Sequence, residues 1–197
     1  MRHPSRSAMP VLATLALATL AAGCDRESVA PTESLALSHG AGLGTPPAAR
    51  NFGAPLNPGE EVPTPTLTET RNPTGNARLR LDGRGTELGY KLIVANIENV
   101  TQAHIHCGAP GVAGPIVAFL FGFVAEGVSA NGILAEATVT AADVIPRPDS
   151  QACPGGVADL AELIAHARAG NAYVNVHTIQ NPAGEIRGQI HTSGPNH

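Results

Sequence analysis

Residues 76–94, NARLRLDGRGTELGYKLIV, decide the fold class of this chain. On both sides of the DGRG sequence at 82–85, apolar side chains alternate with polar or small ones. An alternation of period two is typical of a strand with one buried face. Two such strands around a short Gly-rich turn predict a β-hairpin. The stretch therefore indicates an antiparallel β protein.

The rest of the chain continues this organisation. Turn sequences rich in Gly, Pro and Asn bound further expected strands at 100–107, 116–121, 133–140, 172–178 and 185–191. One short helix is expected at about 158–169, because apolar residues recur there at helical spacing and Gly170 follows as a C-terminal cap. Together these elements predict an all-β protein, an antiparallel β-sandwich or Greek-key barrel with one helix.

The composition argues against several classes of function. Charged residues make up 14% of the chain and the formal net charge is −4, so no basic surface is expected to meet a nucleic acid. Aromatic residues make up only 3% and tryptophan is absent, which argues against stacking platforms for bases or sugars. Serine is scarce in the β region, so a Ser/His/Asp hydrolase has no natural nucleophile. We favour a non-catalytic protein and leave enzymatic activity open.

The N-terminus has the pattern of an export signal. Arg2 and Arg6 precede an apolar run at 9–23, which is shorter than the roughly 20 residues that a membrane-spanning helix needs. The run ends in LAAGC at 20–24, which resembles the bacterial lipobox and implies cleavage before a lipidated Cys24. The alternatives are ordinary cleavage near Ala22, which leaves a free thiol, and a buried N-terminal helix.

Four segments follow from these patterns. We expect a signal peptide at 1–23, a lipidated cysteine and flexible tether at 24–50, a β domain at 51–192 and a disordered tail at 193–197. A structured cap on the domain is the alternative for the tether. The expected location is the bacterial cell envelope, where the lipid on Cys24 anchors the chain to the inner or outer membrane. A protein partner is expected but not identified.

Four stretches of the β region carry a family resemblance. They are GEEVP at 59–63, AHIHCG at 103–108, GNAYVNVHT at 170–178 and NPAGEIRGQI at 181–190. In this order they resemble the CHRD (chordin-type) domain family, which is found in secreted bacterial proteins and in animal chordin. The resemblance implies an all-β extracellular module and brings no general enzymatic activity with it. It does not imply growth-factor binding, since function does not follow from fold.

Two cysteines remain once Cys24 is assigned to the lipid. Cys107 and Cys153 are expected to form a disulfide, because two cysteines in an oxidising compartment usually pair. The alternative is that these sulfurs are thiolate ligands of a metal.

Histidines and other polar residues gather on one face of three expected strands. Period-two geometry places His104 with His106, places Asn175 with His177, and places Glu185 and Arg187 with His191. If these faces converge, the first two histidines and His177 can bind copper or zinc, with His191 or Glu185 as a fourth ligand. The alternative is a structural polar network that includes Asn175, Glu185 and Arg187.

These patterns lead to three functional hypotheses. The first is a non-catalytic, membrane-tethered CHRD-type module with a binding or structural role at the cell envelope. The second is a copper- or zinc-binding envelope protein that uses the His-x-His strand. The third is a redox enzyme, because that strand is similar to the copper ligands of Cu/Zn superoxide dismutase. We find no counterpart in the sequence of that enzyme's long zinc loop, which argues against the third.

Overall fold

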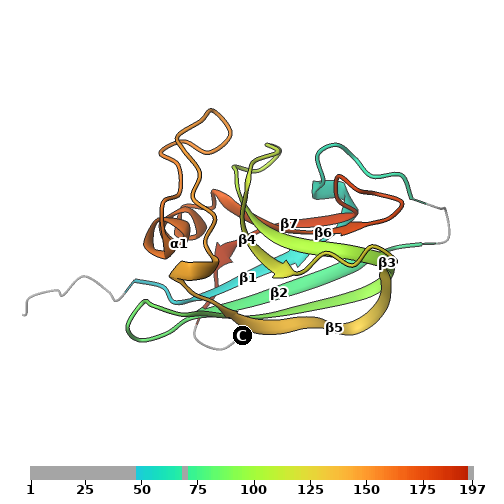
Figure 1. Cartoon of the computed structure of the whole chain (residues 1–197), viewed down its shortest axis with the longest axis horizontal. Helices are drawn as coiled ribbons and strands as arrows, with labels where there is room; N and C mark the ends of the chain where they lie inside the picture. The colour runs from blue at the N-terminus through green and yellow to red at the C-terminus, as the bar shows by residue number, and fades with distance from the viewer. Residues whose placement is uncertain (1–47, 68–70, 195–197) are drawn as a thin grey trace, which may run out of the picture. The chain divides into compact units, whose positions relative to one another are not determined.

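The computed structural model describes residues 48–67 and 71–194, which belong to one compact unit (Figure 1). The expected signal peptide, Cys24 and the tether up to residue 47 lie outside the described residues, as do residues 195–197 of the expected tail. Among the helices described, none has the length and apolar character to cross a bilayer.

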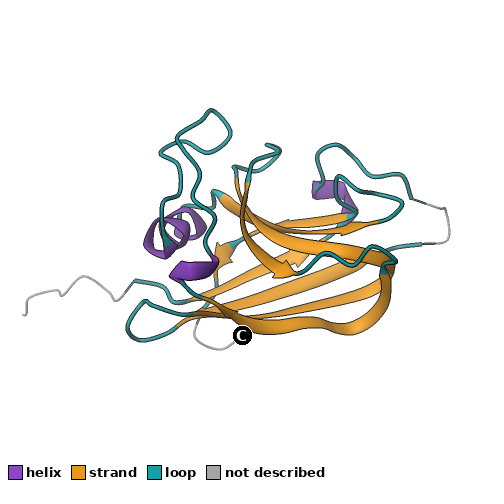
Figure 2. Cartoon of the chain, viewed as in Figure 1, coloured by secondary structure: helices purple, strands orange, loops and turns teal. Residues whose placement is uncertain are grey.

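The described chain is built almost entirely of antiparallel strands (Figure 2). In chain order, its elements are β1 (Asn51–Leu56), the 3₁₀ turn η1 (Pro58–Glu60), β2 (Thr74–Leu81), β3 (Leu88–Cys107), β4 (Ile116–Phe121), β5 (Val128–Val139), the 3₁₀ turn η2 (Ala141–Asp143), α1 (Leu160–Arg168), β6 (Ala172–Thr178), β7 (Ile186–Gln189) and β8 (His191–Thr192). The predicted all-β fold with one helix is confirmed.

Strand β3 connects two layers of the sheet. Its first half pairs with β2 on one side and β5 on the other, whereas its second half pairs with β6 and β4. Strands β1 and β8 extend the first layer beyond β2, and β7 extends the second layer beyond β6. A bridge between Asn57, directly after β1, and Arg187 on β7 then joins the two layers. The result is a nearly closed, barrel-like sheet, with β3 running along its length (Figure 1).

The length of β3 corrects one sequence expectation. The second hairpin strand, ending at 94, and the strand expected at 100–107 are parts of one strand of 20 residues in the structure, which continues through 96–99. Asn96 and Asn99 adopt φ angles of 57° and 55°, and the pairing with β5 shifts register around them. Asparagine tolerates this left-handed conformation better than most residues. The turn residues therefore bend the strand between layers without ending it.

Other boundaries differ by a few residues. The expected strand at 185–191 is divided into β7 and β8, and β5 begins five positions earlier than the expected 133. Helix α1 agrees closely with the predicted span. It begins after Asp159, whose side chain accepts a hydrogen bond from the Glu162 backbone N–H at 3.0 Å, an ordinary N-cap.

The second layer buries both of its faces. Ile105 of β3, Val174 of β6 and Ile186 of β7 project into the hydrophobic core. Their neighbours along each strand therefore project toward the opposite face of the sheet. That opposite face would be wet in an open sheet, yet every residue of β6 is buried. The 108–115 loop is hydrogen-bonded to it through Arg187, and the turn after β6 is hydrogen-bonded to it through His177. This covered polar face holds the candidate site.

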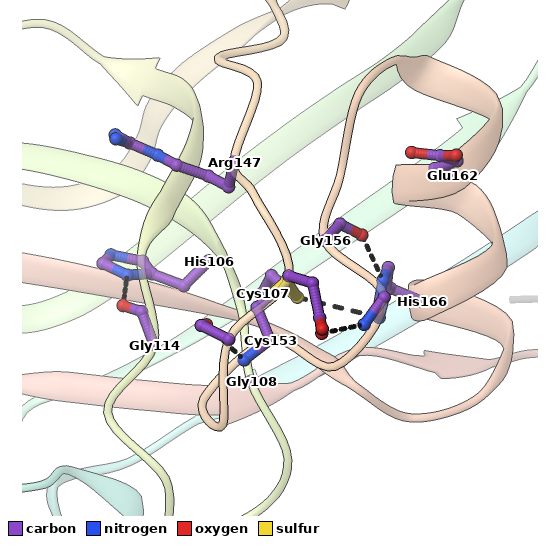
Figure 3. Close-up of a disulfide and its surroundings, with 12 residues drawn as sticks. His106, Cys107, Gly108, Gly114, Arg147, Cys153, Gly156, Glu162 and His166 are labelled. Atoms are coloured by element: carbon purple, nitrogen blue, oxygen red, sulfur yellow. Dashed lines mark hydrogen bonds between the residues drawn. A yellow bond between two sulfur atoms is a disulfide. The ribbon is translucent and has the colours of Figure 1, made fainter. Parts of the chain in front are cut away.

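The predicted disulfide between Cys107 and Cys153 is confirmed (Figure 3). It joins the end of β3 to the loop before α1, with the two Cα atoms 5.4 Å apart. Helix residue His166 lies beside it, with Nδ1 3.7 Å from Cys107 Sγ and Nε2 2.8 Å from the Gly156 carbonyl oxygen. Because each sulfur is bonded to the other, neither serves as a thiolate ligand in this structure.

Candidate metal centre

Three histidines converge on the covered face of the second layer. His104 and His106 come from β3, and His177 comes from the adjacent β6, where it pairs with Gln102. The ring centres are 4.8 Å apart for His104–His177, 5.4 Å for His104–His106 and 6.2 Å for His106–His177. Each ring offers a nitrogen within 4.8 Å of the other two. Their exposed fractions are 0%, 7% and 6%, so the cluster is shielded from solvent.

Backbone carbonyls set the protonation of two of the rings. His106 Nδ1 lies 2.8 Å from the Gly114 oxygen, and His177 Nδ1 lies 3.0 Å from the Pro182 oxygen (the first is drawn in Figure 3). A carbonyl can only accept, so each Nδ1 carries the proton and each Nε2 keeps its lone pair. Metal-binding histidines are commonly oriented in this way, with the second nitrogen bonded to an outer acceptor.

The third ring leaves a lone pair without a partner. His104 Nδ1 is 3.0 Å from His177 Nε2, which is an acceptor, so His104 Nδ1 donates and its Nε2 has the lone pair. His104 Nε2 and His106 Nε2 are both buried and have no hydrogen-bond partner in the described part of the chain. A buried polar atom left unpaired costs about 1–3 kcal/mol. A cation shared with His177 Nε2 would instead take the place of the His104 Nδ1 proton, so His104 would ligate through Nδ1 and carry its proton on Nε2.

Asn175 is the polar neighbour of His177 on the same strand. Its Oδ1 lies 3.0 Å from His177 Nε2, so an oxygen acceptor faces a nitrogen acceptor. Rotation of the Asn175 amide by 180° places Nδ2 at this position, where it donates an ordinary hydrogen bond to His177 Nε2. Burial lowers the pKa of His177, although the Pro182 carbonyl opposes this shift, so a second proton on this ring is disfavoured at neutral pH. His177 Nε2 is thus an acceptor that both His104 Nδ1 and Asn175 face.

The electrostatics keep the imidazoles in the form that binds metals. Burial, with a further contribution from the neighbouring histidines, lowers the pKa of His104 to about 3. Burial also lowers the pKa of His106 to about 4, against the opposing effect of its bond to the Gly114 carbonyl. Metal ligation requires neutral imidazole, so no proton has to be displaced from these two rings at neutral pH.

A cationic and aromatic stack holds one ligand and its covering loop. The Tyr173 ring lies parallel to the His106 ring, with centres 4.8 Å apart, and the Arg187 guanidinium lies 3.4 Å from the Tyr173 ring centre. Arg187 also donates to the carbonyl oxygens of Ala109 and Val112, at 3.0 Å each. Arg187 thus fixes the 108–115 loop over the site and is not a ligand.

Neither of the two fourth ligands named from the sequence joins the cluster. The carboxylate of Glu185 is bound elsewhere, with hydrogen bonds from Arg71, Thr178, Gln180 and Asn181. His191 is exposed on β8 beside Gly53, and its Nδ1 lies 3.2 Å from the Gln189 oxygen. Strand β7 begins after Glu185 and ends before His191, so the period-two alternation that had placed these two side chains on one face with Arg187 does not extend to them.

Two residues that lie beside the site, Glu61 and Phe119, were not predicted from the sequence to belong to it. Glu61 is buried with Oε1 unpartnered, and desolvation raises its pKa to about 7 although the charge of Arg187 opposes the shift. Phe119 on β4 packs edge-on against His104, with ring centres 4.5 Å apart. Glu61 lies in the GEEVP motif, which marked it without explaining it. Phe119 lies in a uniformly apolar strand that gives no signal of facing a polar site.

The fold and this cluster define a disulfide-linked, all-β module with a buried group of imidazoles. The profile of the CHRD domain matches residues 52–190, and the chain belongs to this family. The resemblance seen in the sequence is thereby confirmed. No curated protein and no solved structure matches the chain.

Proposed function

We propose that this chain is an exported, lipid-anchored CHRD module whose role is to bind a copper or zinc ion through His104, His106 and His177. The observation that carries the proposal is the convergence of three buried, neutral imidazoles, two of them oriented by main-chain carbonyls. Neutral imidazole suits both zinc and copper. The module would act by holding the ion and not by catalysis.

The ring spacing supports an ion at the centre of the cluster. An ion about 2.0–2.1 Å from each ring nitrogen lies roughly 3 Å from each ring centre, so three rings around it have centres about 5–6 Å apart. The observed separations run from 4.8 to 6.2 Å. The separations of the ring centres are thus compatible with one ion, and His104 Nδ1 and His177 Nε2, 3.0 Å apart, are the nitrogens of these two rings that would share it.

The contrast with Glu185 argues against a purely structural network of histidines. That buried carboxylate receives hydrogen bonds from four side chains, as buried polar groups in native proteins normally do. The histidine cluster, equally buried, has two unpaired nitrogens among the described atoms. Around Glu185 the corresponding unpaired atom is Arg71 Nε, on a side chain that is 21% exposed, whereas the unpaired histidine nitrogens belong to residues that are at most 7% exposed.

Burial of the rings favours storage, sensing or delivery of an ion over catalysis on a substrate. A catalytic metal keeps an open coordination position that a substrate can reach. The three rings here are at most 7% exposed and lie beneath the 108–115 loop. This arrangement does not favour the dismutase-like activity considered from the sequence.

The envelope location rests on the N-terminal sequence. The lipobox-like LAAGC at 20–24 and the Ser-, Ala- and Pro-rich stretch after it support lipid anchoring through Cys24. The disulfide fits an oxidising compartment. A Cys24→Ser chain is expected to move from the membrane fraction to the soluble periplasmic fraction, and an unchanged membrane fraction would refute the anchor.

Metal analysis tests the binding role directly. The lipoprotein is purified from membranes in detergent, dialysed and analysed for metal per chain, alongside a His104→Ala/His106→Ala double variant. We expect about one copper or zinc ion per chain, lost in the double variant. His191→Ala is the matched control, because that histidine is exposed outside the cluster, and it should retain the metal. A folded wild-type chain that binds neither ion refutes the proposal.

A further inference from the structure

The donor set of the cluster is small and chemically uniform. Within residues 48–67 and 71–194, no fourth histidine, cysteine or carboxylate offers an atom within 4.8 Å of all three imidazoles. The nearest further donor is the neutral amide oxygen of Asn175. Structural zinc sites are almost always four-coordinate, commonly with thiolate ligands. Three imidazoles alone suit an ion that needs only three ligands, as monovalent copper does.

The charge around the cluster also disfavours a divalent ion. All three ring donors are neutral, and the Arg187 cation lies over Tyr173, which stacks on His106. The cost of burying an ion rises with the square of its charge, so a divalent ion pays roughly four times the desolvation penalty of a monovalent one. The buried carboxyl beside the site, Glu61, has its pKa raised to about 7 by desolvation and faces the charge of Arg187, so it offsets only part of that penalty and a monovalent ion is favoured.

Phe119 shields the cluster from solvent on the β4 side. Its ring packs edge-on on His104, with an angle of 88° between the rings, and is itself 45% exposed. His104 is fully buried beneath it. Divalent copper prefers a tetragonal set of nitrogen and oxygen ligands, whereas the described cluster offers three imidazoles. A site with few ligands, closed over His104, therefore favours the reduced ion.

We propose that the ion held by His104, His106 and His177 is monovalent copper, kept in that oxidation state by the cover of Phe119. This inference rests on the proposed metal-binding function and specifies its ligand. No redox step is part of the binding itself. Oxidation of the site would transfer one electron from the copper ion to dioxygen and would require new ligands around the divalent product.

Competition for each ion tests the choice of metal. The full chain carrying Cys24→Ser, which removes the sulfur at residue 24, is titrated without oxygen with monovalent copper against bicinchoninate. Zinc is titrated separately against a chromophoric chelator. We expect one copper ion per chain, bound at least about 100-fold more tightly than zinc. Zinc binding of equal or greater strength overturns this inference and leaves the proposed function standing, whereas failure of both ions overturns both.

Exposure to air tests the shielding. The copper-loaded chain, its Phe119→Ala variant and a Phe123→Ala control are followed by electron paramagnetic resonance, which detects divalent copper. Phe123 is exposed and makes no ring contact with the three histidines. The Phe123→Ala variant should therefore develop the divalent copper signal no sooner than the parent chain. Phe119→Ala should gain the divalent signal about tenfold faster. A parent chain that oxidises as fast as Phe119→Ala overturns the role of Phe119.

Discussion

Replacement of Glu185 by glutamine should destabilise the fold strongly, although the two side chains have the same shape. The carboxylate is fully buried. Its Oε1 accepts from Arg71 at 2.8 Å, and its Oε2 accepts from Thr178 at 2.6 Å and from Gln180 and Asn181 at 2.9 Å each. Glutamine has one acceptor oxygen, so whichever way its amide lies, an NH₂ group faces a donor.

The magnitude follows from the bonds that are lost. With the amide oxygen toward the three neutral donors, the NH₂ group faces the Arg71 guanidinium and the charge-assisted bond becomes a repulsion. Loss of one partner of a buried ion pair costs about 3–5 kcal/mol, and Arg71 is itself only partly exposed. We therefore expect the free energy of unfolding to fall by about 3 kcal/mol.

Urea denaturation of the metal-free chain, with the disulfide intact, measures this change. In a domain of this size, a loss of about 3 kcal/mol lowers the melting temperature by roughly 6–12 °C. The matched control is Glu136→Gln, because Glu136 makes a 3.0 Å surface ion pair with Lys91 and is more than half exposed. That variant should lose at most about 0.5 kcal/mol. A Glu185→Gln variant within 1 kcal/mol of the parent would refute the reasoning.

Three further outcomes follow from the structure. In the folded, metal-free chain, the pKa of each buried imidazole is lowered from 6.5. Below pH 6.5 the unfolded chain therefore binds more protons than the folded chain. The free energy of unfolding should then fall by about 1.4 kcal/mol for each such proton and each pH unit. Glu61 acts in the opposite direction: its pKa is raised to about 7, so between about pH 7 and 4.5 the folded chain binds one proton more at this residue. The histidines outnumber it, so the urea midpoint should fall from pH 6.5 to 4.5, and an unchanged midpoint would contradict this expectation. Replacing Cys107 and Cys153 together by alanine opens a loop with a sequence separation of 46 and should cost about 4 kcal/mol, and an unchanged melting temperature would count against it. Gly114→Ala places a Cβ against the Cys107 carbonyl and so displaces the Gly114 carbonyl that holds His106 Nδ1. Metal affinity should therefore fall about 10- to 100-fold. The control is Gly122→Ala, whose Cβ meets only open space and should leave the affinity unchanged.

The candidate site illustrates how far local patterns can be carried. Alternation along the strands correctly placed His104 with His106 on one face, and Asn175 with His177 on one face of the next strand. It could not show that the strands at 100–107 and 172–178 are direct neighbours, because strand order depends on contacts distant in sequence. The two predicted fourth ligands, Glu185 and His191, lie away from the cluster for a related reason. Strand β7 is only four residues long, and the predicted alternation was extended beyond both of its ends.

The amino-acid sequence by itself determined the β class, the single helix, the disulfide and the family, because period-two alternation, helical spacing and short motifs are local features. Only the tertiary structure decided that the imidazoles meet, that Glu185 bonds to Arg71 and that Phe119 covers His104. These outcomes depend on the register between strands and on loops folding back over a polar face. Register and loop closure arise from packing over the whole sheet, and no local stretch of sequence encodes them.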